Sequence, residues 1–93
     1  MGIVSSVAQV DPTQYFKVLP NPVNDVCYNQ LKTLLSEPYT VSIFDLNGRL
    51  VHQTPETNLA FLPISVEHLH NGVYLVQLQH QNARYTQRLV VRR

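Results

Sequence analysis

The sequence predicts a small antiparallel β-sandwich, and three observations support this fold class. Short stretches rich in Val, Ile, Leu, Tyr and Phe follow one another along the 93 residues, with turn-forming residues between them. Two of these stretches alternate apolar and polar side chains, which is the pattern of a strand with one buried face. No stretch has the length and spacing of a stable helix. About seven short strands of this kind favour two sheets packed face to face, as in immunoglobulin-like domains.

The segment 1–14 is interpreted as a linker ahead of a single domain that spans 15–93. It lacks the basic start and the long apolar run of a secretory signal peptide. Within it, Asp11 precedes Pro12, and a residue before proline avoids the helical region of backbone angles. We therefore expect a loosely ordered lead-in.

The first two strands are expected at 15–19 and 26–31. Between them, the sequence Pro-Asn-Pro at 20–22 stiffens the chain and ends the pairing of the first strand. A short helix over 29–37 is the alternative for the second strand, because its leucines follow helical spacing. So short a helix is unstable alone, and Pro38 closes it. We therefore favour a strand followed by a loop.

A β-hairpin is expected next, with strands at 40–45 and 50–54. The sequence between them is Asp-Leu-Asn-Gly followed by arginine. Asp45 can accept hydrogen bonds from backbone N–H groups of the turn, and Gly48 can adopt a positive φ. This turn fixes which residues of the two strands lie opposite one another.

Three further strands, at 59–66, 73–80 and 84–92, complete the prediction. Gly72 follows His-Asn and makes a sharp turn into the strand at 73–80, which alternates most clearly. The side chains expected to face the core from this strand and from 40–45 are Val41, Ile43, Tyr74, Val76 and Leu78; Ser42, Gln77 and Gln79 are expected on the opposite faces.

The charge balance argues against a protein whose main task is to bind nucleic acid. The chain carries 7 Lys and Arg against 6 Asp and Glu, for a formal net charge of +1. Binding to a phosphate backbone needs a concentrated basic face. One local asymmetry lies in 82–93, which holds four arginines and no acidic residue. A run of about 18 apolar residues, as a transmembrane helix requires, does not occur.

The sequence contains none of the motifs that would predict an enzyme. The sequence has no nucleophile elbow, glycine-rich phosphate loop, zinc-protease motif or EF-hand. Its single cysteine, Cys27, excludes an intrachain disulfide and is expected to be a small buried hydrophobe. His68 and His70 are expected to be exposed turn residues rather than metal ligands. We predict no catalytic, cofactor-binding or metal-binding residue.

A β-sandwich that binds a sugar or a peptide is a physically possible alternative function. Such sites place aromatic faces, above all tryptophan, on an exposed sheet. The chain has no Trp, and its five Tyr and three Phe residues are expected mostly in the core. Phe44, Val73 and Leu75 are expected on the outer face of a strand, where they can meet another protein.

Four blocks of sequence, taken in order, resemble the C-terminal sorting domain of the type IX secretion system, type A-like. They are Phe-Lys-Val-Leu-Pro-Asn-Pro at 16–22, Val-Ser-Ile-Phe-Asp-Leu-Asn-Gly-Arg-Leu-Val at 41–51, Ile-Ser-Val at 64–66 with Leu69, Gly72, Tyr74 and Val76, and Arg-Leu-Val-Val-Arg at 88–92. The resemblance covers 15–93.

The resemblance implies that the domain is a sorting signal rather than an enzyme. Proteins with such domains are exported by Bacteroidetes-type bacteria, first into the periplasm by an ordinary signal peptide. The folded domain then directs a cargo fused to its N-terminal side through the outer-membrane translocon. A surface sortase commonly removes the domain, and the cargo is released or joined to anionic lipopolysaccharide. Cleavage would fall within or just upstream of 1–14, and the chain would be part of a longer precursor.

The residues that the resemblance marks as the signal are Pro20, Asn21, Pro22, Asp45, Gly48, Arg49, Gly72, Tyr74, Arg88, Leu89, Val90, Val91 and Arg92. We expect the turns at 45–49 and 71–74 to form a rigid surface, with the basic last strand facing the partner. Pairing of that exposed edge strand with the translocon is one possible mode. The alternative function is a retained cell-surface module that binds protein or lipopolysaccharide.

Overall fold

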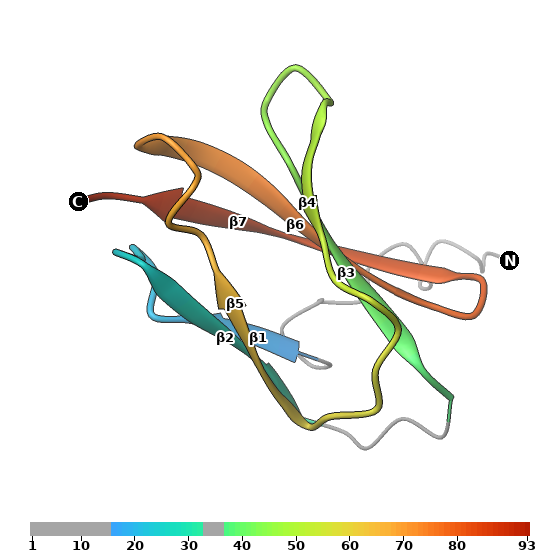
Figure 1. Cartoon of the computed structure of the whole chain (residues 1–93). Helices are drawn as coiled ribbons and strands as arrows, with labels where there is room; N and C mark the ends of the chain where they lie inside the picture. The colour runs from blue at the N-terminus through green and yellow to red at the C-terminus, as the bar shows by residue number, and fades with distance from the viewer. Residues whose placement is uncertain (1–15, 33–36) are drawn as a thin grey trace, which may run out of the picture.

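A computed structural model describes residues 16–32 and 37–93 and contains seven β-strands within them (Figure 1). They are β1 (Phe16–Leu19), β2 (Val26–Leu31), β3 (Tyr39–Phe44), β4 (Leu50–Gln53), β5 (Phe61–Ser65), β6 (Gly72–His80) and β7 (Ala83–Val91). Each predicted strand is present, so the all-β interpretation is confirmed. The expected lead-in at 1–14 lies outside the described residues.

The strands form two antiparallel sheets that face each other (Figure 1). One has three strands in the order β1-β2-β5, and the other has four in the order β4-β3-β6-β7. Figure 1 shows the end of β7 beside the loop that joins β5 to β6. The arrangement is the expected sandwich, with β7 at an edge of the larger sheet.

The core lies between the two sheets and has the composition that the alternation predicted. Tyr74, Val76 and Leu78 of β6 are buried, as are Val41 and Ile43 of β3. The other buried apolar side chains are Phe16, Val18, Val23, Cys27, Tyr39, Ile64, Val66, Leu69, Leu89 and Val91. Packing of this apolar surface is the main stabilising contribution in a domain that has no disulfide.

Strand β2 buries one polar residue on its core-facing side. Asn29 is fully buried, and its side-chain NH₂ donates a hydrogen bond to the hydroxyl of Tyr39 at 3.4 Å. That hydroxyl donates to the carbonyl of Leu59 at 2.6 Å. The NH₂ of Asn29 is therefore satisfied, whereas its Oδ1 is buried without a hydrogen-bond partner among the described residues. Tyr28, the preceding residue, is on the opposite side of the strand and half-buried.

Of the seven described aromatic residues, four lie in the core or pack against it, as expected: Phe16, Tyr39, Tyr74 and Tyr85. Phe16, Tyr39 and Tyr74 are buried there, but the ring of Tyr28 stacks on that of Phe61 with centroids 4.8 Å apart. Phe61 is 50% exposed. Stacking between neighbouring strands covers part of each ring without placing either in the core.

Strand β5 is shorter than expected because its first residues serve other contacts. The carbonyl of Ala60 accepts the N–H of Leu31, and the N–H of Leu59 donates to the hydroxyl oxygen of Thr57 at 3.1 Å. Pro63 lies within β5 without disrupting the sheet, because β5 is an edge strand and proline has no N–H to donate.

Candidate recognition surface

The turn between β3 and β4 is organised by one carboxylate. Oδ1 of Asp45 accepts hydrogen bonds from the N–H groups of Asn47 and Arg49, both at 2.9 Å. Oδ2 lies 3.1 Å from Nε of Arg49. The backbone N–H of Arg49, followed by its side chain and the N–H of Asn47, holds the pKa of Asp45 below its usual value, against a smaller opposing effect of desolvation.

Gly48 gives this turn a backbone conformation that other residues rarely adopt. Its φ is +86°, and its N–H donates to the carbonyl of Asp45 at 3.0 Å. The N–H of Asp45 in turn donates to the carbonyl of Arg49 at 2.9 Å. The predicted roles of Asp45 and Gly48 are thus confirmed, and they present Arg49 with a side chain that is 79% exposed.

The Pro-Asn-Pro segment reaches across the sandwich to the edge of β7. The side-chain NH₂ of Asn21 donates to the carbonyl of Arg88 at 3.0 Å, and its Oδ1 accepts the N–H of Val90 at 2.9 Å. Both flanking peptide bonds, Leu19–Pro20 and Asn21–Pro22, are cis. Asn21 thereby occupies backbone groups that a neighbouring strand would otherwise pair with.

Val23 extends this pairing toward the end of β7. Its N–H donates to the carbonyl of Val90 at 2.8 Å, and its carbonyl accepts the N–H of Arg92 at 2.9 Å. The backbone edge of the last strand, expected to be exposed for one possible mode of pairing with the translocon, is therefore occupied over this stretch. Between Arg88 and Arg92 that edge is already bonded to the segment that follows β1.

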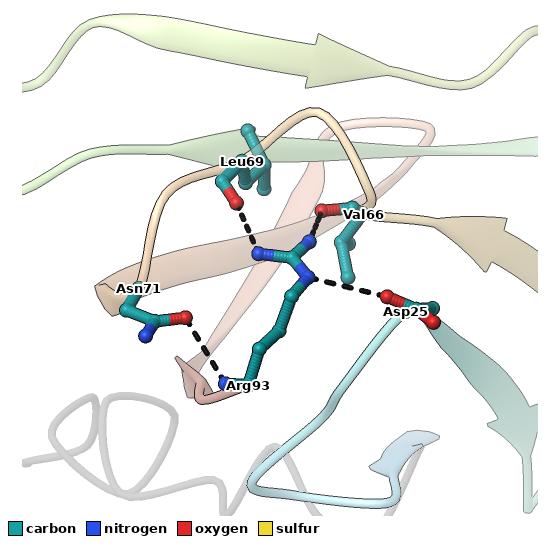
Figure 2. A network of polar contacts seen from close by, with 5 residues as sticks. All are labelled: Asp25, Val66, Leu69, Asn71 and Arg93. Carbon is teal, nitrogen blue, oxygen red and sulfur yellow. Dashed lines mark hydrogen bonds and ion pairs between the residues drawn. The ribbon is translucent and has the colours of Figure 1, made fainter.

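Arg93 ties the end of β7 to the loop between β5 and β6 (Figure 2). Its guanidinium donates to the carbonyls of Leu69 and Val66 at 2.6 and 2.5 Å, and its Nε lies 3.2 Å from Oδ1 of Asp25. Its backbone N–H donates to Oδ1 of Asn71 at 3.0 Å. We call these contacts the Arg93 network.

The Arg93 network corrects the view of the C-terminal arginines as four cations without a counter-charge. Arg93 has Asp25 as its partner, and its side chain is only 29% exposed. Arg84, Arg88 and Arg92 are exposed. Nothing in the sequence indicates the ion pair between Asp25 and Arg93, because the two residues are separated by 68 positions.

Tyr74 is directed into the core, and its hydroxyl holds the turn before β6. The hydroxyl donates to the carbonyl of His70 at 2.7 Å. Gly72, which opens β6, lies opposite Val91 at the end of β7. The turn that the sequence predicted at His70 to Gly72 is therefore attached both to the core and to the last strand.

One residue from each strand of the larger sheet forms a row across its outer face, which we call the outer row: Leu50, Phe44, Leu75 and Arg88. Phe44 lies opposite Leu50 on one side and Leu75 on the other, and Leu75 lies opposite Arg88. Leu50 is 50% exposed and Leu75 36%. The next pair along β6 and β7, Val73 and Val90, is half-buried.

The structure separates the predicted signal residues into three groups. Arg49, Arg88 and Arg92 are exposed around the outer row, with Asp45 and Gly48 shaping the adjacent turn. Pro20, Asn21 and Pro22 lie along the edge of β7. Leu89 and Val91 are buried, and Tyr74 is 8% exposed, so the side chains of these three belong to the core. Gly72 and Val90 border them.

Cys27 and the histidines at 68 and 70 are the potentially reactive side chains that the sequence singled out. Burial raises the pKa of the Cys27 thiol to about 11, which disfavours a reactive thiolate. His68 and His70 are exposed turn residues, as predicted. Within 16–32 and 37–93, no three His, Cys, Asp or Glu side chains are grouped to hold a metal. In the same residues no helix has the length and apolar character to cross a membrane.

Comparison with models of known protein families identifies the family of this chain. No curated protein matches the chain. The family model described as the secretion system C-terminal sorting domain matches residues 17–92, which include every strand of both sheets except the first residue of β1. The chain therefore belongs to the secretion system C-terminal sorting domain family, the sorting signals of type IX secretion.

Proposed function

We propose that this domain carries a cargo fused to its N-terminal side through the type IX outer-membrane translocon, and that the translocon reads the folded domain. Its family is a class of non-catalytic secretion tags that direct export toward the cell surface or the extracellular space. We include in this proposal the recognition of the domain by translocon components, its removal by a sortase and the fate of the cargo.

One observation carries the proposal: sequence blocks that lie far apart meet around β7. Asn21 bonds to β7 from the exit of β1, and Phe44 and Leu75 connect the block at 41–51 to Arg88. Val66 and Leu69 accept hydrogen bonds from Arg93. Because each block depends on the others for its position, the signal exists only in the folded domain.

We further propose that a surface sortase cuts on the N-terminal side of β1. The first described strand begins at Phe16, and its backbone is paired with β2 from there onward. A protease needs an extended segment free of such pairing, which favours a cut before this strand. The released cargo would then be secreted or joined to anionic lipopolysaccharide.

Export of a reporter tests the proposal. A periplasm-directed reporter fused to the full chain is expressed in a bacterium with type IX secretion and in the same strain without a working translocon. We expect the reporter outside the first strain and in the periplasm of the second. Equal periplasmic retention in both strains would refute the proposed function.

The C-terminal sequence of the exported reporter distinguishes the two candidate fates. A new end before Phe16 supports removal by a sortase. An exported reporter that keeps the whole domain would instead support a retained surface module that binds protein or lipopolysaccharide. Deleting 89–93 is a poor test, because Leu89 and Val91 are in the core and the deletion would unfold the domain.

A further inference from the structure

The larger sheet presents an apolar and cationic outer face that its own chain leaves partly exposed. The outer row runs across all four strands and ends at Arg88. Leu50 and Leu75, which flank Phe44 in the row, are 50% and 36% exposed, so the row presents contiguous apolar surface on the face opposite the core. At the opposite end of the same face, Gln79 and Arg84 lie opposite each other in a polar setting.

The charged residues on the strands that carry the outer row have one sign. The sequences of β3, β4, β6 and β7 contain no Asp or Glu, whereas Arg84 and Arg88 are exposed on β7. Arg92 follows β7 and is exposed, and Arg49 is exposed at the adjacent turn. The nearby carboxylate, Asp45, forms an ion pair with Arg49 at 3.1 Å, so Arg88 and Arg92 are the exposed cations in or beside the row that have no ion pair with a described residue.

We propose that the outer row, with Arg92 beside it, is the docking surface for an acidic protein partner whose contact area has an apolar centre. This inference rests on the proposed function and adds the chemistry of the partner. Charge complementarity favours carboxylates opposite the arginines, and apolar side chains would cover Phe44 and Leu75.

A protein fits this surface better than a membrane does. Phe44, Val73 and Val90 are half-buried within the sheet, so they form a shallow face rather than side chains that project into a bilayer. The apolar area of such a face is buried most fully against another folded surface of matching shape. Arg88, at the end of the row, is of a residue type that is enriched at protein interfaces.

The position of Arg88 provides a matched control on its own strand. Arg84 and Arg88 are both exposed on the same face of β7, four positions apart. Arg88 lies opposite Leu75 in the outer row, whereas Arg84 lies opposite Gln79. Arg84→Glu and Arg88→Glu change the net charge of the domain by the same amount. A docking surface that includes Arg88 and not Arg84 therefore predicts that the two variants differ in their effect on export.

The test compares export of the reporter fused to the full chain for Arg88→Glu, Arg88→Lys, Arg84→Glu and Leu75→Ser. We expect Arg88→Glu and Leu75→Ser to lower the exported fraction about tenfold, as loss of an interface hot spot does. Arg88→Lys and Arg84→Glu should stay within about twofold of the unaltered domain. Urea unfolding of the purified full chains checks that all four variants fold.

Each outcome has a defined meaning. If the unaltered fusion is exported and folded Arg88→Glu and Leu75→Ser are exported equally well, the docking surface is wrong and the proposed function stands. If Arg84→Glu fails as strongly as Arg88→Glu, general charge rather than the outer row decides export, which overturns the inference. Failure of the unaltered fusion overturns both proposals.

A second measurement separates a protein partner from a membrane. The purified full chain is mixed with vesicles of phosphatidylglycerol and phosphatidylcholine, and binding is followed by flotation. We expect that Arg88→Glu does not lower the fraction of the chain bound to these vesicles. Binding that depends on both Arg88 and phosphatidylglycerol would assign the surface to an anionic membrane and overturn the assignment to a protein.

Discussion

The side-chain carbonyl of Asn21 accepts a hydrogen bond from the backbone N–H of Val90 at 2.9 Å, across 69 positions of the sequence. The same amide donates to the carbonyl of Arg88. A single side chain thus does for the edge of β7 what a neighbouring strand would do. It connects the exit of the first strand, in one sheet, to the last strand, in the other.

Replacing Asn21 tests how much this connection stabilises the domain. Asn21→Ala removes two hydrogen bonds to backbone groups and should lower the free energy of unfolding by about 1–2 kcal/mol. Urea unfolding followed by circular dichroism measures the change. Asn24→Ala, at an exposed residue of the same loop, is the control and should stay within about 0.5 kcal/mol. Equal effects of the two variants would contradict the bonding role of Asn21.

Replacing Arg93 tests the network at the other end of the sandwich. Arg93→Ala leaves the carbonyls of Val66 and Leu69 without their charged donor, and we expect a loss of about 2 kcal/mol. Arg93→Lys keeps the charge but cannot reach both carbonyls and Asp25 together, so its loss should be intermediate. The exposed neighbour gives a control, Arg92→Ala, which should change stability little. Denaturant titrations at equal salt compare the three.

The features predicted correctly from the sequence are those that short-range chemistry determines. Asp45, Gly48 and Arg49 lie within five positions, so the carboxylate, the positive φ and the backbone N–H groups are all visible in one motif. Alternation in β6 likewise requires only the period of a strand. The turn and the strand that leads into it therefore follow from local sequence.

The missed features depend on residues that only folding brings together. Nothing near Asn21 or Arg93 indicates that one bonds to β7 and the other to the loop after β5. The face of β2 was hidden for a related reason: Asn29 is buried because Tyr39 provides a partner for its amide. Polarity alone would place Asn29 outside and Tyr28 inside, which is the reverse of what occurs.

The turn at Asp45 should make stability depend on acid. The backbone N–H of Arg49 is the main cause of the lowered pKa of Asp45, so the folded protein favours the carboxylate. This contribution is complete above the ordinary pKa and is lost as the pH falls through the lower pKa of the folded state. Asp45→Asn should therefore lose less stability than the unaltered domain between about pH 5 and about pH 2. An NMR titration that places the pKa of Asp45 at or above its ordinary value would contradict this.

The thiol of Cys27 should be inert in the folded domain. Burial raises its pKa from 9.0 to about 11, which reduces the thiolate about a hundredfold at pH 8 before access is considered. A chromogenic disulfide reagent should therefore react at least about a hundred times more slowly with the folded chain than with the chain in concentrated urea. Rates within tenfold of each other would show that the thiol is exposed or activated.

The imidazole of His52 should weaken the domain in mildly acidic solution. Its ring centroid lies 5.1 Å from that of His68, and burial first, with His68 second, lowers its pKa from 6.5. Since the unfolded chain binds this proton more readily, stability is unaffected above the ordinary pKa and falls as the pH drops below it, down to the lower pKa of the folded state. His52→Gln should therefore flatten the dependence of the free energy of unfolding on pH just below 6.5. His70→Gln, in the exposed turn, is the control and should leave that slope unchanged; an equal slope in His52→Gln and the unaltered domain would contradict the assignment.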